Sequence, residues 1–297
     1  MYITGMFKEL DRLGYGAYLE KYPFHRELGI DLKVYIKEKG GLNKKRVKNK
    51  FESVEINNKV PFPVELDDLI RLHFLVTSRK VTTILEFGVG KSTKVFDHAL
   101  SINENKYKSY VTNSLKRSNK FECHSVDTSR KWIKTTREQF QTDHVRYHHA
   151  KCQVSTFNGR ICTMYKKLPN ICPDLIYLDG PDQYSPKGNV RGISTRHPDR
   201  LPMAGDLLAI EHFLLPGALI VVDGRTANAR FLKANFQRSW RYQYFKNFDQ
   251  HFFELDESPL GVWNERQMNF TSAKDYDLLD SKKSKSNNSV LRTKYLH

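Results

Sequence analysis

The stretch ILEFGVGKST, from Ile84 to Thr93, decides the fold of this chain. Its first part is a short apolar run that contains one acid, Glu86, and is typical of a buried strand. Two glycines follow, Gly88 and Gly90, where the backbone can turn tightly and approach a ligand closely. The stretch therefore predicts a strand, a glycine-rich turn and the start of a helix.

The second half of this stretch, GVGKST, invites two other interpretations. A phosphate loop needs the pattern GxxxxGK[ST], and the position of its first glycine is occupied by Leu85 inside the strand, so the loop cannot wrap a phosphate. A dinucleotide fingerprint, GxGxxG/A, needs a small residue where Thr93 stands. Lys91 is accordingly interpreted as a surface residue at a helix start rather than a phosphate ligand.

Composition indicates a globular protein with a basic surface. The chain has 297 residues, 39% of them hydrophobic, and a net charge of +16 from 49 basic and 33 acidic residues. This charge makes nucleic acid a candidate partner, while a solvated basic surface explains it equally well. We expect no membrane span, and the N-terminal sequence lacks the pattern of a secretion signal. The four cysteines have no CxxC spacing, so a cytoplasmic location with reduced thiols is expected.

The chain divides by composition into three parts. Residues 1–60 are predicted to be a basic N-terminal extension, in which the basic run KEKGGLNKKRVKNK is mobile or lies on a surface. Residues 61–270 are predicted to form one folded domain. Residues 271–297 are predicted to be a polar C-terminal tail.

Strand and helix patterns alternate within residues 61–270. Strands are expected at VTTILEF, FECHSVD, HVRYHHA, PDLIYLDGP and ALIVVDG, with helices between most of them. The dipeptide Asn158-Gly159 between two alternating runs predicts a hairpin. WRYQYF and QHFFEL predict a second hairpin near the C-terminus. This order predicts an α/β fold, a three-layer sandwich with a mostly parallel sheet and a closing antiparallel hairpin.

A second acid, Asp127, closes the strand FECHSVD, and its carboxylate can accept both ribose hydroxyls of a nucleoside lying over the glycines. With these residues the chain resembles the class I S-adenosylmethionine-dependent methyltransferases. The resemblance covers residues 64–255 and rests on ILEFGVGKST, SVD, PDLIYLDGP, LLPGALIVVDG and the last hairpin. The chain is most similar to the branch in which DGP follows the fourth strand. The resemblance implies a Rossmann-like, seven-stranded sheet and S-adenosylmethionine as cofactor.

The resemblance also implies roles for particular residues. Glu86, Gly88 and Gly90 match the loop that holds the methionine part of the cofactor, and Asp127 matches the ribose-binding acid. The predicted cofactor-binding set also includes Ser92, Thr93 and Asp179. Ser92 and Thr93 can cap the following helix. Two features depart from the family: the long stretch SINENKYKSYVTNSLKRSNK, and HHAKC after the third strand, which leaves the adenine contact unassigned.

Two acids, Asp179 and Asp223, end the strands in YLDGP and VVDGR and are the predicted catalytic residues. Asp179 is placed to act as a general base for a hydroxyl acceptor. The pair is also a candidate Mg²⁺ site, because catechol-type methyltransferases resemble it there, although Gly224 stands where they have Asn. Turn initiation before glycine is the alternative role for both acids.

The segment 181–205 is long for a loop inside a domain, and such loops are usually functional. Its predicted acceptor-binding residues are Tyr184, Arg191, Arg196 and His197, which can hold a phosphate, a carboxylate or a sugar. The predicted activity is O-methylation of a small molecule or glycan. The alternatives are an RNA or other nucleic-acid methyltransferase, and a non-catalytic basic nucleic-acid-binding protein on the same scaffold.

Overall fold

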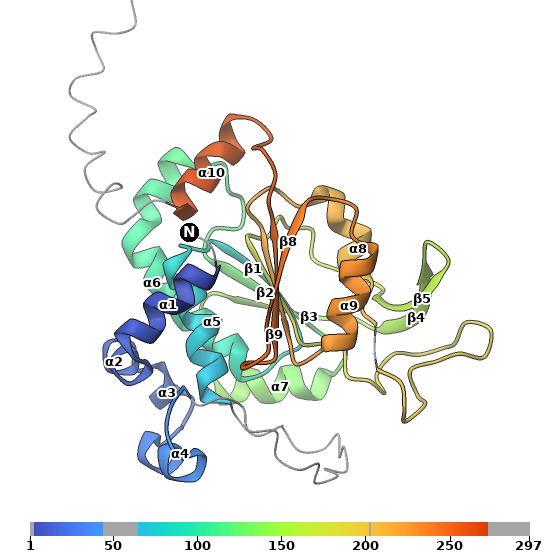
Figure 1. Ribbon diagram of the computed structural model, residues 1–297, viewed down its shortest axis with the longest axis horizontal. Coiled ribbons are helices and arrows are strands. Elements are labelled where there is room, and N and C mark those ends of the chain that lie inside the picture. The colour runs from blue at the N-terminus through green and yellow to red at the C-terminus, as the bar shows by residue number, and fades with distance from the viewer. Residues whose placement is uncertain (1–2, 44–64, 202, 273–297) are drawn as a thin grey trace, which may run out of the picture.

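A seven-stranded sheet forms the centre of the molecule (Figure 1). The computed structural model describes residues 3–43, 65–201 and 203–272. The strands of the sheet are β1 (Thr83–Phe87), β2 (Glu122–Asp127), β3 (Val145–His149), β6 (Leu175–Leu178), β7 (Leu219–Asp223), β8 (Trp240–Phe245) and β9 (Gln250–Leu255). Their order is β3-β2-β1-β6-β7-β9-β8. The first five are parallel, whereas β9 runs antiparallel to β7 and β8 antiparallel to β9. The predicted Rossmann-like sheet with its antiparallel C-terminal hairpin is confirmed.

Helices cover both faces of this sheet (Figure 1). The helices α5 (Leu66–Ser78) and α6 (Lys91–Ser114) bury their apolar side chains with Ile84 in one core cluster. The helices α8 (Asp206–Ile210) and α9 (Thr226–Asn235) bury theirs with Leu85 and Phe87 in the other. Because neighbouring residues of a strand point to opposite faces, one continuous apolar run supplies both cores. The helix α7 (Arg130–Gln139) packs beside β2 and β3.

Four helices that the sequence patterns did not predict lie at the N-terminus: α1 (Ile3–Leu13), α2 (Tyr15–Lys21), α3 (Phe24–Glu27) and α4 (Leu32–Lys39). Leu10, Tyr18 and Phe24 are buried in the same core cluster as α5 and the sheet. The Tyr18 hydroxyl also lies 2.7 Å from Nδ1 of His73 on α5. Residues 3–43 thus pack against the sheet domain. The predicted three-part division of the chain stays a prediction, and the end of its basic run and most of its C-terminal tail lie outside the described residues.

Several elements differ in extent from the predicted pattern. The helix α6 continues to Ser114, so most of the long stretch before β2 is helical. The helix α8, which precedes β7, is short and is followed by a 3₁₀ turn, Glu211–Phe213. A further helix, α10 (Val262–Ser272), follows the last strand. The predicted hairpin forms from β4 (Cys152–Phe157) and β5 (Arg160–Tyr165), with positive φ at Asn158 and Gly159.

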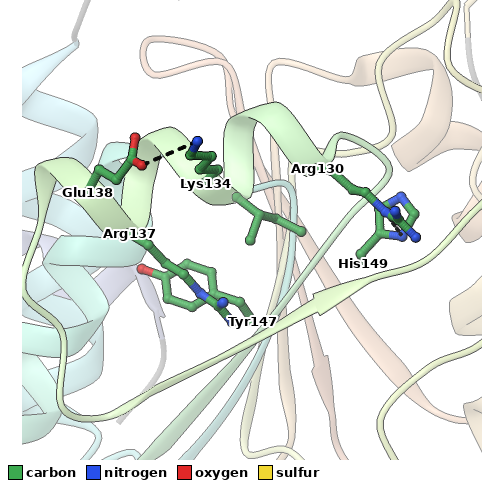
Figure 2. Close-up of a pocket in the computed structure, with 7 residues that line it drawn as sticks. Arg130, Lys134, Arg137, Glu138, Tyr147 and His149 are labelled. Carbon is green, nitrogen blue, oxygen red and sulfur yellow. Dashed lines mark hydrogen bonds and ion pairs between the residues drawn. The ribbon is translucent and has the colours of Figure 1, made fainter.

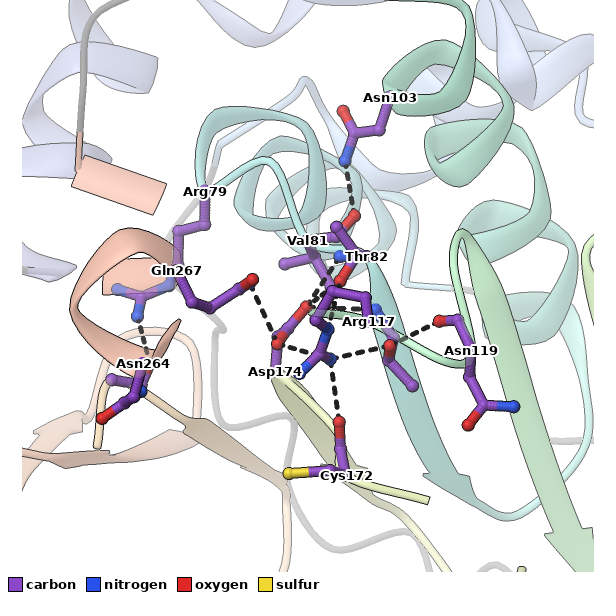
Figure 3. Close-up of polar contacts among 12 residues, drawn as sticks. Arg79, Val81, Thr82, Asn103, Arg117, Asn119, Cys172, Asp174, Asn264 and Gln267 are labelled. Atoms are coloured by element: carbon purple, nitrogen blue, oxygen red, sulfur yellow. Dashed lines mark hydrogen bonds and ion pairs between the residues drawn. The ribbon is translucent and has the colours of Figure 1, made fainter. Parts of the chain in front are cut away.

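The amino-terminal ends of β1 and β6 are joined by a polar network, which Figure 3 shows. Asp174 accepts hydrogen bonds from the backbone and hydroxyl of Thr82, at 2.8 and 2.5 Å, and from Gln267 of α10 at 3.2 Å. Arg117 forms an ion pair with Asp174 at 2.7 Å and donates to the carbonyl of Cys172 at 2.8 Å. This end of the sheet is therefore held by charged side chains with few exposed atoms. The carboxyl ends of the five parallel strands lie at the opposite edge.

Neither a membrane-spanning helix nor a disulfide bond is found in the described residues. Within residues 3–43, 65–201 and 203–272, no helix combines the length and apolar character needed to span a bilayer. The four cysteines are all free thiols.

Candidate functional site

The glycine loop after β1 lies directly against the turn after β6. Gly88 has φ +103°, and its N–H donates to the carbonyl of Val126 at 2.9 Å. A Cβ atom on Gly180 would approach the backbone nitrogen of Gly88 to 2.9 Å, so a side chain at residue 180 would force the two turns apart. A Cβ atom on Gly90 would meet no atom within 4 Å. The loop is thus closed on the side of β6 and open above Gly90.

Glu86 lies beneath this loop and is fully buried. Its carboxylate accepts hydrogen bonds from the hydroxyls of Ser92 at 2.6 Å, Thr93 at 2.8 Å and Ser125 at 2.5 Å. Desolvation raises the pKa of Glu86 to about 7, although the three hydroxyl donors act in the opposite direction. The structure brings three predicted cofactor-binding residues together, with the hydroxyls of Ser92 and Thr93 directed at Glu86. This arrangement fixes the start of α6 to β1 and β2.

Asp127 lies at the carboxyl end of β2, beside the same loop. Its Oδ2 accepts a hydrogen bond from the backbone N–H of Val89 at 3.0 Å, and its Oδ1 accepts one from Ser129 at 2.6 Å. Desolvation raises the pKa of Asp127, while these two backbone donors oppose the shift. The predicted acid and the predicted glycine loop therefore meet at one edge of the sheet.

Asp179 follows β6, Asp223 is the last residue of β7, and Arg225 contacts Asp179. The Arg225 guanidinium is 3.5 Å from Oδ1 of Asp179 and donates to the carbonyl of Pro181 at 2.9 Å. The hydroxyl of Tyr177 donates to Asp223 at 2.8 Å. Desolvation raises the pKa of Asp179, Arg225 lowers it, and the charge of Asp223 raises it again, with a net upward shift. Since the Asp179 side chain is 54% exposed, solvent limits this shift.

Arg225 was not among the predicted site residues. Its signal in the sequence is a basic residue directly after the VVDG turn, at the same strand end as Asp223. Arg225 forms an ion pair with Asp179. In the part of the chain that the structure describes, no group of three or more His, Cys, Asp or Glu side chains is arranged to hold a metal ion. The predicted Mg²⁺ site at Asp179 and Asp223 stays a prediction.

The segment 181–205 runs along the β4–β5 hairpin, beyond the end of the sheet (Figure 1). Lys187 donates its N–H to the carbonyl of Cys152 at 3.0 Å and accepts from the N–H of Val154 at 2.8 Å. Near its other end, Met203 accepts from the N–H of Thr163 at 2.8 Å. Backbone hydrogen bonds thus attach this segment to both strands of the hairpin.

The four predicted acceptor-binding residues lie along this segment. Arg191 stands at a turn with φ +55°, and its side chain is exposed, as are those of Arg196 and His197. Tyr184 is half-buried. Within the described residues, no hydrogen bond or ion pair joins any of these four side chains to Asp179. Their role in binding an acceptor stays a prediction.

Comparison with known proteins finds likeness in structure only. No protein-family model matches the chain, and no curated protein matches it. The SAH-bound methyltransferase PaMTH1 of Podospora anserina is 14% identical, with a TM-score of 0.37 over 67% of this chain and 84% of that one. The O-methyltransferase TomG of Streptomyces achromogenes, in complex with SAM, is 14% identical, with a TM-score of 0.34 over 66% and 82%. An O-methyltransferase of Bacillus cereus in complex with SAH is 12% identical, with a TM-score of 0.34 over 67% and 85%. Function therefore has to be inferred from the residues of this chain itself.

Proposed function

We propose that this chain is an S-adenosylmethionine-dependent methyltransferase that acts on a hydroxyl group of a small molecule or sugar. The observation that supports this proposal is the hydrogen bond from Val89 to the carboxylate of Asp127, because it holds beside the glycine loop the acid that we propose to bind the ribose. Ligands of such open sheets bind outside the carboxyl ends of the strands, where these two features lie.

The residues at this edge fit a nucleoside cofactor. The space above Gly90 leaves the loop backbone accessible, so a ligand can approach it closely. Each oxygen of Asp127 accepts one backbone hydrogen bond, and a carboxylate oxygen has a second lone pair that can accept a ribose hydroxyl. Glu86 contributes indirectly, since it holds the loop through Ser92 and Thr93. The bound cofactor supplies a methyl group activated on a sulfonium sulfur.

Asp179 is the proposed general base. It lies at the end of β6, next to the glycine loop, and its carboxylate would accept the proton of an acceptor hydroxyl. A pKa raised above that of an ordinary aspartate makes it a stronger base near neutral pH. Arg225 orients this carboxylate through their ion pair. In this proposal Tyr184, Arg191, Arg196 and His197 contact the acceptor beyond the transfer site.

Titration calorimetry with S-adenosylmethionine tests the first step of this proposal. The wild-type chain is expected to bind the cofactor, and Asp127→Ala to weaken binding by at least about tenfold, since charge-assisted hydrogen bonds to both hydroxyls are lost. Asp182→Asn is the matched control, because this exposed carboxylate neighbours Asp127. A wild-type chain that binds no cofactor would refute the proposal.

Transfer of a labelled methyl group to small hydroxylated molecules and sugars tests the second step. Asp179→Asn is expected to lower kcat by roughly 100-fold or more, in line with the loss of a general base. Methylation of RNA but of no small molecule or sugar would contradict the proposed acceptor class.

A further inference from the structure

A basic groove lies between α7 and the edge strand β3 (Figure 2). Its volume is about 390 Å³, and its lining residues are Arg130, Ile133, Lys134, Arg137, Glu138, Tyr147 and His149. None of these residues belongs to the glycine loop or to the turns after β6 and β7. The groove begins beside the proposed cofactor site, since His149 is the strand partner of Asp127, and it extends away from that site along α7.

Three cations line up along the groove. Arg130, Lys134 and Arg137 stand at positions i, i+4 and i+7 of α7, which share one helical face and span about 10 Å at 1.5 Å per residue. Glu138 is the one acid among the lining residues. It lies 3.7 Å from Lys134, and both side chains are more than half exposed, so this ion pair is weak. The groove keeps a net positive charge.

The two arginines are held at opposite ends of the groove, as Figure 2 shows. His149 donates from Nε2 to the carbonyl of Thr128 at 3.2 Å, so its Nδ1 is free to accept the Nε–H of Arg130 at 3.4 Å. The guanidinium of Arg137 lies 4.9 Å from the ring centroid of Tyr147. Among the described residues, neither arginine forms an ion pair with an acid, and no hydrogen bond uses the terminal nitrogens of Arg130. Both guanidinium groups can therefore still bind an anion.

We propose that this groove binds the diphosphate group of a small ligand, such as a nucleoside diphosphate or a compound linked to one. Arginine binds phosphate oxygens through paired hydrogen bonds, and Lys134 adds a point charge between the two arginines. The stacked Arg137 and Tyr147 offer a planar surface for a base or sugar ring. The groove volume lies within the range of small-molecule sites. The residues and contacts that define this groove do not depend on the proposed methyl transfer.

Titration calorimetry of the full chain with inorganic pyrophosphate and with ADP tests the proposal. Arg130→Gln and Arg137→Gln are each expected to weaken binding about tenfold, the loss expected for a charge-assisted contact. The matched control is Lys108→Ala, which removes one exposed cation from an i,i+4 ion pair with Glu104 on α6 and is expected to change nothing. Because Arg130 and Arg137 are exposed, their variants should fold, which thermal unfolding verifies.

The remaining outcomes each support or overturn the proposal. Equal weakening by Lys108→Ala would show unspecific attraction to a basic protein and overturn it. A single-stranded RNA oligomer that binds more tightly than ADP, with affinity falling steeply as salt rises, would assign the groove to nucleic acid instead. Saturating S-adenosylhomocysteine should leave pyrophosphate affinity within about twofold, since none of the lining residues is among those proposed to bind the cofactor. Direct competition would assign the groove to the cofactor site and overturn the proposal.

Discussion

Two regions of this molecule carry residues predicted to bind ligands, and they are built in opposite ways. At the glycine loop, Glu86 and Asp127 accept hydrogen bonds from the residues that follow β1 and β2. In the segment 181–205, Arg191 and Arg196 have exposed side chains, and backbone hydrogen bonds to the β4–β5 hairpin hold the segment in place.

This difference separates two kinds of binding residue. Residues that are one another's hydrogen-bond partners are held before any ligand arrives, so their removal costs stability as well as affinity. Removing an exposed side chain from a segment that backbone hydrogen bonds hold in place changes the free energy of unfolding little. The role of such a side chain is seen only in the affinity for a ligand. The variants below test this distinction, from the largest expected effect to the smallest.

Glu86→Gln should remove a pH dependence of stability. The pKa of Glu86 is about 7 in the folded chain against an ordinary value of 4.5, so the folded state keeps a proton that the unfolded state loses between those pH values. Wild-type stability therefore falls as pH rises from 4.5 to 7, by about 3 kcal/mol for this difference of 2.5 units. Chemical denaturation at several pH values measures the slope in both proteins. Burial also raises the pKa of Asp206, so the stability of both proteins falls with rising pH for that reason. The prediction concerns the difference between wild type and variant, and parallel curves of stability against pH would contradict it.

Arg225→Met should shift the pH dependence of catalysis. The guanidinium lowers the pKa of Asp179, so its loss raises that pKa and the base remains protonated to higher pH. The acidic limb of the kcat profile is expected to move to higher pH. Arg200→Met, which removes a cation from the 181–205 segment, serves as control. An unchanged limb with lowered kcat would mean that Arg225 only shapes the turn after β6.

Arg191→Ala and Arg196→Ala should raise the KM for the acceptor, by up to about tenfold if each arginine contacts an anionic group. Their unfolding free energies should stay within about 0.5 kcal/mol of wild type, because both side chains are exposed. Steady-state kinetics and denaturant titration on the same samples separate the two effects. A large loss of stability would show that the segment is held by its side chains as the glycine loop is.

Lys91→Ala is expected to have the smallest effect. The residue is the first of α6 and is only partly buried, and it takes no part in the hydrogen bonds around Glu86. Cofactor affinity measured by calorimetry should remain within about twofold of wild type. A tenfold loss would revive the phosphate-loop interpretation of GVGKST, in which this lysine contacts a phosphate.

Much of the fold follows from local patterns. The apolar run before Gly88 predicts β1 because a strand buried on both faces needs apolar side chains in succession. The hairpin at Asn158 and Gly159 follows from the positive φ that both residues adopt. The helices of residues 3–39 were missed because their burial depends on partners such as His73, 55 residues after Tyr18.

The sequence by itself determined the alternation of strands and helices, the glycine turn and the placement of Asp127 and Asp179 at strand ends, since each depends on a few consecutive residues. Only the tertiary structure decided what those acids touch. Arg225 reaches Asp179 across 46 residues because β6 and β7 are neighbours in the sheet. The groove between α7 and β3 likewise exists because a helix face meets an edge strand, and no local pattern records which side chains face each other across such a contact.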